Sequence, residues 1–190
     1  MADDVFLLDT NIISNSSKKR PSIAVTEWLE TQRRVAIPFP VILEVETGIA
    51  EISITDPPKA ALLRQWADEL FETDFMMPLP NAKVAAVLGK LYSCRSLNMH
   101  WLADPYADRK RPGQDLFIAA LSIVYDLPIA TLDHKDFMQI HQFFELPGVY
   151  NPEIGLWAIA RNNPANSKSA DQQPTYPDRN AGPALYGVGR

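Results

Sequence analysis

Cysteine is nearly absent from this chain, because Cys94 is the only one in 190 residues. A single thiol cannot build a disulfide framework or a cysteine zinc site, and it suits a reducing compartment. Long apolar runs are also missing, since none approaches the roughly 18 residues of a membrane helix. The chain begins Met1-Ala2-Asp3-Asp4, which lacks the basic start of a signal peptide. These absences predict a cytoplasmic protein without a membrane segment.

An excess of positive charge is absent too. The chain has 18 Lys and Arg against 23 Asp and Glu, for a formal net charge of −5. Binding to a nucleic acid would therefore depend on a local basic patch or on metal ions. One basic run, Arg109-Lys110-Arg111, comes just before Asp115. It is a candidate contact for an RNA backbone, although such a run is more often a solvated loop.

Short apolar runs alternate with helical patterns along most of the chain. Strands are predicted at 5–8, 35–37, 75–79 and 128–131, with a last edge strand at 149–150. Helices with a 3.6-residue period are predicted between these strands, after Ser22, Pro40, Pro57, Asn81, Asp115 and Asp133. This alternation predicts an α/β fold, a three-layer sandwich in which helices flank a mostly parallel central sheet of four to five strands.

Two helices carry specific packing expectations. Gly48 is expected to let its helix approach a neighbour closely, one turn after Glu44. In the next helix, Leu62, Trp66 and Leu70 are spaced by four and are expected to form the buried face.

Composition divides the chain into two parts. Residues 1–157 have the apolar periodicity of one folded domain. Residues 158–190 are rich in Pro, Asn, Ser and Gly and have few large apolar groups. Because such a segment cannot bury enough surface to offset its ordering entropy, we predict that it is a disordered tail.

Four acids are candidates for one site. Asp9 and Asp133 follow the ends of predicted strands, Asp115 starts a helix, and Glu44 lies on the core-facing side of another. Ligands bind at the carboxyl ends of strands in open α/β sheets. Gathered carboxylates would repel one another unless a hard cation such as Mg²⁺ or Mn²⁺ neutralised them. Taken singly, each Asp is equally a turn or helix-cap residue and Glu44 a solvated one, so the hypothesis depends on their joint arrangement.

Such a bound cation suits phosphodiester hydrolysis, because it activates water and stabilises the leaving oxygen. Thr10 and Asn11 would then be donors that orient Asp9 or contact phosphate.

The motifs around these acids resemble those of PIN-domain ribonucleases, especially the VapC/FitB-like toxins of toxin–antitoxin pairs. The resemblance covers about residues 5 to 157 and rests on four segments and a family-like ending. These are Leu7-Leu8-Asp9-Thr10-Asn11, Ile42-Leu43-Glu44-Val45-Glu46-Thr47-Gly48, Gln114-Asp115-Leu116-Phe117-Ile118-Ala119-Ala120, Thr131-Leu132-Asp133-His134-Lys135-Asp136-Phe137 and Asn151-Pro152.

The resemblance implies a PIN-like nuclease domain over residues 1–157. It implies that Asp9, Glu44, Asp115 and Asp133 bind one or two Mg²⁺ or Mn²⁺ ions and hydrolyse RNA endonucleolytically. Asp133 is preferred over Asp136 as the fourth acid because it directly follows the strand. The resemblance further implies a protein antitoxin that occupies the site, and a homodimer.

Two other functions fit parts of the pattern. A phosphatase with Asp9 as covalent nucleophile would need an acid two residues later, where Asn11 stands instead. A catalytically inactive PIN-like module would bind RNA or protein without cutting, and the presence of all four acids argues against it. The sequence therefore favours a metal-dependent ribonuclease toxin.

Overall fold

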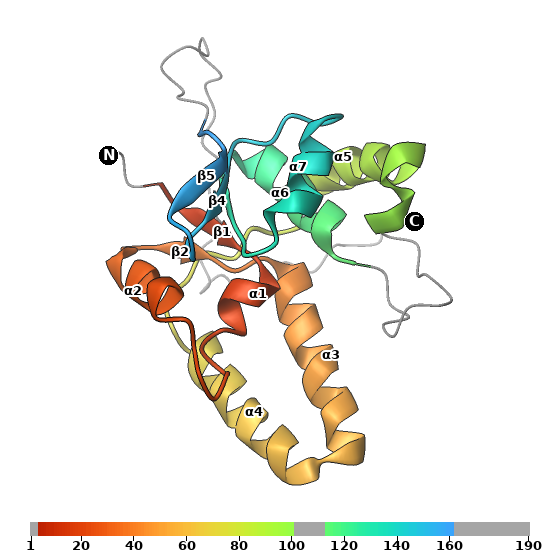
Figure 1. Ribbon diagram of the computed structural model, residues 1–190. Helices are drawn as coiled ribbons and strands as arrows, with labels where there is room; N and C mark the ends of the chain where they lie inside the picture. The colour runs from red at the N-terminus through yellow and green to blue at the C-terminus, as the bar shows by residue number, and fades with distance from the viewer. Residues whose placement is uncertain (1–3, 101–112, 162–190) are drawn as a thin grey trace, which may run out of the picture.

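The computed structural model describes residues 4–100 and 113–161, and Figure 1 shows their arrangement. The strands are β1 (Phe6–Leu8), β2 (Val35–Ala36), β3 (Ile129–Ala130), β4 (Val149–Asn151) and β5 (Leu156–Ile159). The helices are α1 (Thr10–Ile13), α2 (Ile23–Thr31), α3 (Phe39–Thr55), α4 (Pro57–Phe71), α5 (Ala82–Ser93), α6 (Asp115–Tyr125) and α7 (His134–His141), with a 3₁₀ helix η1 (Arg95–His100).

The strands form one sheet in the order β2-β1-β3-β4-β5. The first four are parallel, and only β5 is antiparallel to its neighbour β4. Leu8 of β1 pairs with Ala130 of β3, so the residues that follow these two strands leave the same edge of the sheet side by side. The predicted α/β fold with a mostly parallel sheet is confirmed.

Two edges of the sheet differ from the prediction. Residues 75–79 form no strand; only Met76 pairs with Ala36, in an isolated parallel bridge. A longer strand here would need a hydrogen bond from the backbone N–H of residue 78, and Pro78 has no N–H to donate. At the other edge, the structure has a strand that was not predicted, β5. Because β5 pairs with β4, the predicted edge strand at 149–150 is an internal strand. Gly155, with φ +66°, forms the turn between the two strands, a conformation that favours glycine.

Helices pack around this sheet (Figure 1). Helix α5 packs on α6, α6 packs on α7, and α7 contacts β4 and β5. Helices α3 and α4 pack on each other as an antiparallel pair that projects away from the sheet (Figure 1). No helix in the described part of the chain is long and apolar enough to cross a membrane.

The expectation for Gly48 was wrong, and the one for α4 held for Trp66 and Leu70, which pack against the core, but not for Leu62. A Cβ added to Gly48 would meet nothing within 4 Å, so this glycine marks no close helix approach. In α4 the fully buried residues are Ala60 and Ala67, while Leu62 is 70 % exposed. The buried positions of α4, which packs on α3, are therefore small residues, and the larger Leu62 is left on the solvent side.

Contacts between aromatic rings connect the sheet to α2. Trp28 of α2 lies 5.2 Å from Phe6 and 5.7 Å from Tyr150, measured between ring centroids. Trp157 of β5 continues the cluster, 5.2 Å from Tyr150. The last described residue, Arg161, then forms ion pairs with Asp4 at 3.4 Å and Asp126 at 2.8 Å. Ordered structure therefore continues a few residues past position 157, and the predicted disorder of 162–190 lies outside the described residues.

Gly148 fits beneath this aromatic cluster, and replacing it should destabilise the fold. A Cβ at position 148 would lie 2.8 Å from Cζ3 of Trp157 and 3.3 Å from the backbone Cα of Arg161. We expect Gly148→Ala to lower the free energy of unfolding by about 1–3 kcal/mol through overpacking. Gly89→Ala in exposed α5 is the control, because its Cβ would meet nothing within 4 Å. It should stabilise the helix by about 0.5–1 kcal/mol, and equal denaturant midpoints for the two variants would contradict the packing argument.

Candidate functional site

Asp9 is the centre of a polar network at the carboxyl end of β1. Its side chain is 7 % exposed and also accepts a 2.7 Å hydrogen bond from the backbone N of Thr10 at the start of α1. The other carboxylate oxygen accepts from Nδ2 of Asn11 and from Oγ1 of Thr131, each at 2.7 Å. A short helix, α1, begins here, and it turns Thr10 and Asn11 back toward Asp9.

Thr131, which sequence reasoning did not select, connects three parts of this network. Its hydroxyl donates to Asp9 and accepts from Nδ2 of Asn11 and from the backbone N of Asp133, both at 3.0 Å. The side chain is fully buried. A threonine at the end of a strand is ordinary for its β propensity, so composition gave little signal. Its position two residues before Asp133 was the available clue.

Removing the Thr131 hydroxyl should destabilise the protein even though the change is nearly isosteric. Thr131→Val removes this partner from the buried Asp9 carboxylate and from groups of Asn11 and Asp133, and a buried group left unsatisfied costs about 1–3 kcal/mol. We expect the midpoint of urea unfolding to fall clearly. Thr131→Ser keeps the hydroxyl and should lose much less. A valine variant as stable as the serine variant would mean that the hydroxyl is not needed.

Asn11 ties the ends of β1 and β3 together. Its Oδ1 accepts a 3.0 Å hydrogen bond from the backbone N of Leu132, while its amide nitrogen donates to Asp9 and Thr131. An amide that donates to Asp9 in this way cannot supply a proton as a general acid. This geometry argues against the phosphatase alternative.

Glu44 and Glu46 lie on α3 and face different neighbours. Glu44 is half-buried, and the Thr10 hydroxyl donates to its Oε2. Glu46 forms a two-pronged ion pair with Arg64 of α4, which lowers the pKa of Glu46. Glu44 was predicted on the core-facing side of its helix, and its contact with Thr10 agrees with that position, whereas Glu46 contacts α4.

Asp115 and Asp133 occupy the first positions of two helices. Asp115 is the first residue of α6, whose N-cap is Gln114, so the expected capping role of Asp115 was wrong. Asp133 is the N-cap residue of α7, yet its side chain makes no cap hydrogen bond. It is exposed, and its backbone is joined to Asp9 through Thr131. Asp136 lies in the first turn of α7.

Three of the candidate acids influence one another electrostatically. Burial, and then the charges of Asp115 and Glu44, raise the pKa of Asp9 from 3.8 to about 7, although the hydrogen bonds from Thr131 and Thr10 oppose the rise. A buried carboxylate near two others is costly to ionise without a cation. The structure therefore brings Asp9, Glu44 and Asp115 into one region, with Asp133 attached through the backbone.

The oxygen atoms of this region, from carboxylates, hydroxyls and an amide, are the kind of ligand that hard cations prefer. In residues 4–100 and 113–161, however, no three His, Cys, Asp or Glu side chains already converge on a common metal position.

A model of the PIN domain family matches residues 6–141, more than half of the chain. The chain belongs to the PIN domain family. No curated protein matches it in sequence.

Solved structures share the PIN fold with this chain. They include FitAB bound to an IR36 DNA fragment, with a TM-score of 0.57 and 22% identity over 78% of this chain and 96% of that one. FitAcB from Neisseria gonorrhoeae gives 0.57 and 23%, over 78% and 98%. VapBC2 from Rickettsia felis, bound to a DNA fragment from their promoter, gives 0.54 and 20%, over 80% and 98%. At such identities the likeness establishes the fold alone.

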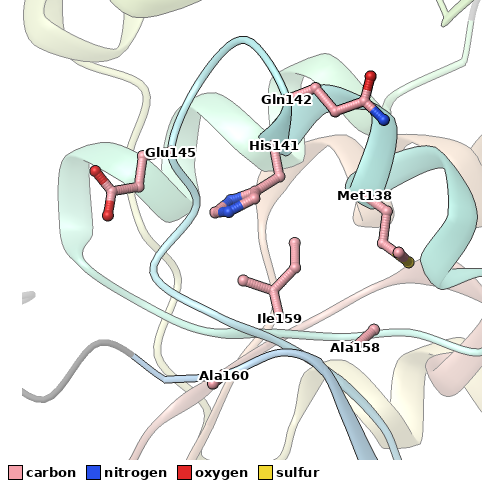
Figure 2. A pocket seen from close by; sticks show the side chains of 7 residues that line it. All are labelled: Met138, His141, Gln142, Glu145, Ala158, Ile159 and Ala160. Carbon is pink, nitrogen blue, oxygen red and sulfur yellow. The ribbon is translucent and has the colours of Figure 1, made fainter.

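The PIN domain also has a groove away from the acids. It has a volume of about 460 Å³ and lies between the C-terminal half of α7 and β5 (Figure 2). Its lining residues are Met138, His141, Gln142, Glu145, Ala158, Ile159 and Ala160. None is one of the four candidate acids, so the groove is separate from the candidate site. The basic run at 109–111 lies outside the described residues.

Proposed function

We propose that this PIN domain is a metal-dependent endoribonuclease, the toxin of a toxin–antitoxin pair, that hydrolyses RNA phosphodiester bonds in the cytoplasm. The observation that carries the proposal is the buried Asp9, whose pKa is raised to about 7 by burial first and then by Asp115 and Glu44. Such a group becomes a favourable ligand once a cation supplies the missing positive charge.

Asp9, Glu44, Asp115 and Asp133 are the side chains that would hold Mg²⁺ or Mn²⁺. When bound, the ion supplies a polarised water and neutralises charge on the phosphate. The chain's own part is positioning: Asn11 and Thr131 fix the Asp9 carboxylate from one side, and Thr10 fixes both Asp9 and Glu44. Asp136 is the alternative to Asp133, because both lie at the start of α7.

The partners of the proposed toxin follow from the same family. The sequence motifs resemble toxins that a small antitoxin inhibits, and the similar VapBC2 structure is bound to promoter DNA. We propose an antitoxin protein as partner and a homodimer as the assembled state. The residues at 109–111, Arg109, Lys110 and Arg111, are proposed contacts for the RNA backbone.

The test is RNA cleavage by purified protein free of any partner, with Mg²⁺ or Mn²⁺ and then with EDTA. We expect cutting only with metal, and none by Asp9→Asn prepared in parallel, which controls for contaminating nucleases. Cutting in EDTA would contradict the metal dependence. A folded, partner-free protein that cuts no RNA class would instead favour the binding-only PIN-like module.

A further inference from the structure

The imidazole of His134 is held by a contact with Asn151, next in the chain to the candidate acid Asp133. His134 is the first residue of α7 and directly follows Asp133. Its ring is half-buried, and its Nδ1 lies 3.2 Å from Nδ2 of Asn151 at the end of β4. Asn151 is itself only 4 % exposed, so this contact is part of the buried framework.

Backbone partners on two sides determine which atom of Asn151 faces the ring. Its Oδ1 accepts a 3.0 Å hydrogen bond from the backbone N of Glu153. Its Nδ2 donates to the backbone O of Leu132 at 3.2 Å. A flipped amide would place its oxygen against the Leu132 carbonyl and its NH₂ against the Glu153 N–H. The NH₂ group therefore faces His134, and Nδ1 must accept.

A neutral imidazole whose Nδ1 accepts carries its proton on Nε2. No residue in the described part of the chain contributes a hydrogen-bond partner for this Nε2. His134 is thus fixed as a donor whose own partner is still to be supplied. The acids around it offer no such fixed donor, since carboxylates only accept when ionised.

The same network connects this donor to the site. The backbone of Leu132 donates to Asn11 and accepts from Asn151, so one residue joins the Asp9 side to the His134 side. Asp133, between Leu132 and His134, is in turn joined to Asp9 through Thr131. The His134 ring and the Asp9 carboxylate are therefore positioned by one rigid set of hydrogen bonds.

We propose that His134 Nε2–H donates to a non-bridging phosphate oxygen of the RNA at the acid site, and that Asn151 is the positioning residue that sets its tautomer. The inference rests on the proposed ribonuclease function and names a substrate contact for it. An imidazole N–H suits this place because it can donate to a phosphate oxygen, which an ionised carboxylate cannot do.

Two substitutions that differ by one methylene separate this role from a packing role. In His134→Asn the side-chain oxygen can still accept from Asn151, but the distal donor is gone. In His134→Gln the longer side chain places an amide N–H near the former Nε2. On an RNA that the wild type cuts, we expect His134→Asn to raise KM about tenfold with kcat little changed, and His134→Gln to stay within about threefold of wild type.

Binding and NMR give readouts that do not depend on turnover. The Kd for the same labelled RNA in EDTA should rise with His134→Asn as KM does. Long-range ¹H–¹⁵N spectra of the free protein at about pH 8 should show His134 as the Nε2–H tautomer. His141→Asn is the matched control, because its Nδ1 also accepts, from Leu146 N at 3.0 Å, but it lies at the far end of α7. It should leave KM and Kd unchanged.

The outcomes separate this inference from the function on which it rests. If the wild type cuts RNA and His134→Asn matches it, the substrate contact is wrong while the nuclease stands. If asparagine restores function better than glutamine, His134 has only a packing role with Asn151. An Nδ1–H tautomer would contradict the geometry. A folded wild type that cuts no RNA would overturn the proposed function and this contact together.

Discussion

Replacing Glu44 with Gln is expected to lower RNA cleavage at least about 100-fold, because even groups that only orient a metal ligand cost 10–100-fold when removed. Glu44 is half-buried and hydrogen-bonded to Thr10, and its charge acts on Asp9. The neutral amide keeps the shape of the side chain but removes a proposed charged ligand. The measurement is the initial rate of RNA cutting with saturating Mn²⁺.

Glu46→Gln is the matched control for that experiment. It is on the same helix two residues later and makes the same chemical change, but its partner is Arg64 on α4. Since this pair is exposed on both sides, its loss should cost at most about 1 kcal/mol of stability and leave the cleavage rate near that of wild type. Equal losses of activity in both variants would show that α3 acts through its structure and not through the Glu44 carboxylate.

Adding Mn²⁺ or Mg²⁺ should stabilise the protein against heat, and more strongly above pH 7 than below it. The physical reason is the pKa of Asp9, which is raised, mainly by burial, from the ordinary value of 3.8 to about 7 in the folded protein. Above that pKa the buried carboxylate is charged and a cation is favoured; below it a proton competes. A metal at 100 times its Kd adds about 2.7 kcal/mol, which raises Tm by roughly 5–10 °C for a domain of this size.

The sign of the pH effect without metal follows from the same shift. Between pH 3.8 and about 7 the folded protein keeps the Asp9 proton that the unfolded chain releases. The folded state thus binds more protons in this window, so stability contributed by Asp9 is lost as pH rises through it. A shift of about three pKa units corresponds to roughly 4 kcal/mol.

Asp9→Asn isolates this contribution from other titrating groups. Its melting temperature should depend less on pH between 4 and about 7 than that of wild type, and it should respond little to either metal. The comparison uses the pH dependence, because the amide also changes hydrogen bonds with Asn11 and Thr131. Equal metal-induced shifts in Tm for the two proteins, or equal shifts on both sides of pH 7, would show that the cation binds elsewhere.

The sequence determined the strands and helices wherever a continuous apolar signal existed. The run from Phe6 to Leu8 is buried on both faces, and such a run predicts a parallel strand directly. Asn81 accepts from the N–H groups of Lys83 and Val84, as its position before an apolar period predicts. Local chemistry sufficed at these places because the deciding interactions lie within one turn or one strand.

The sequence did not predict β5 or the full buried face of α4, because both depend on contacts with other segments. The strand β5 has mostly exposed or half-buried residues and exists because it pairs with β4 after the Gly155 turn. Helix α4 packs on α3 and has Ala60 and Ala67 buried while Leu62 lies outside, which its spacing of large apolar residues did not predict. The local sequence pattern of a segment does not show which strand it will pair with or which helix it will pack against.

The candidate site divides in the same way. The sequence by itself supplied the acids, since Asp9 and Asp133 follow strand ends and Glu44 lies on the inner side of its helix. Only the tertiary structure decided how Asp9 is held, because Thr131 lies 122 residues away and reaches it through the pairing of β1 with β3. Likewise, Asn151 meets His134 only because β4 ends beside the start of α7. Hydrogen bonds between distant segments depend on the register of the sheet, and register is fixed by the packed core as a whole.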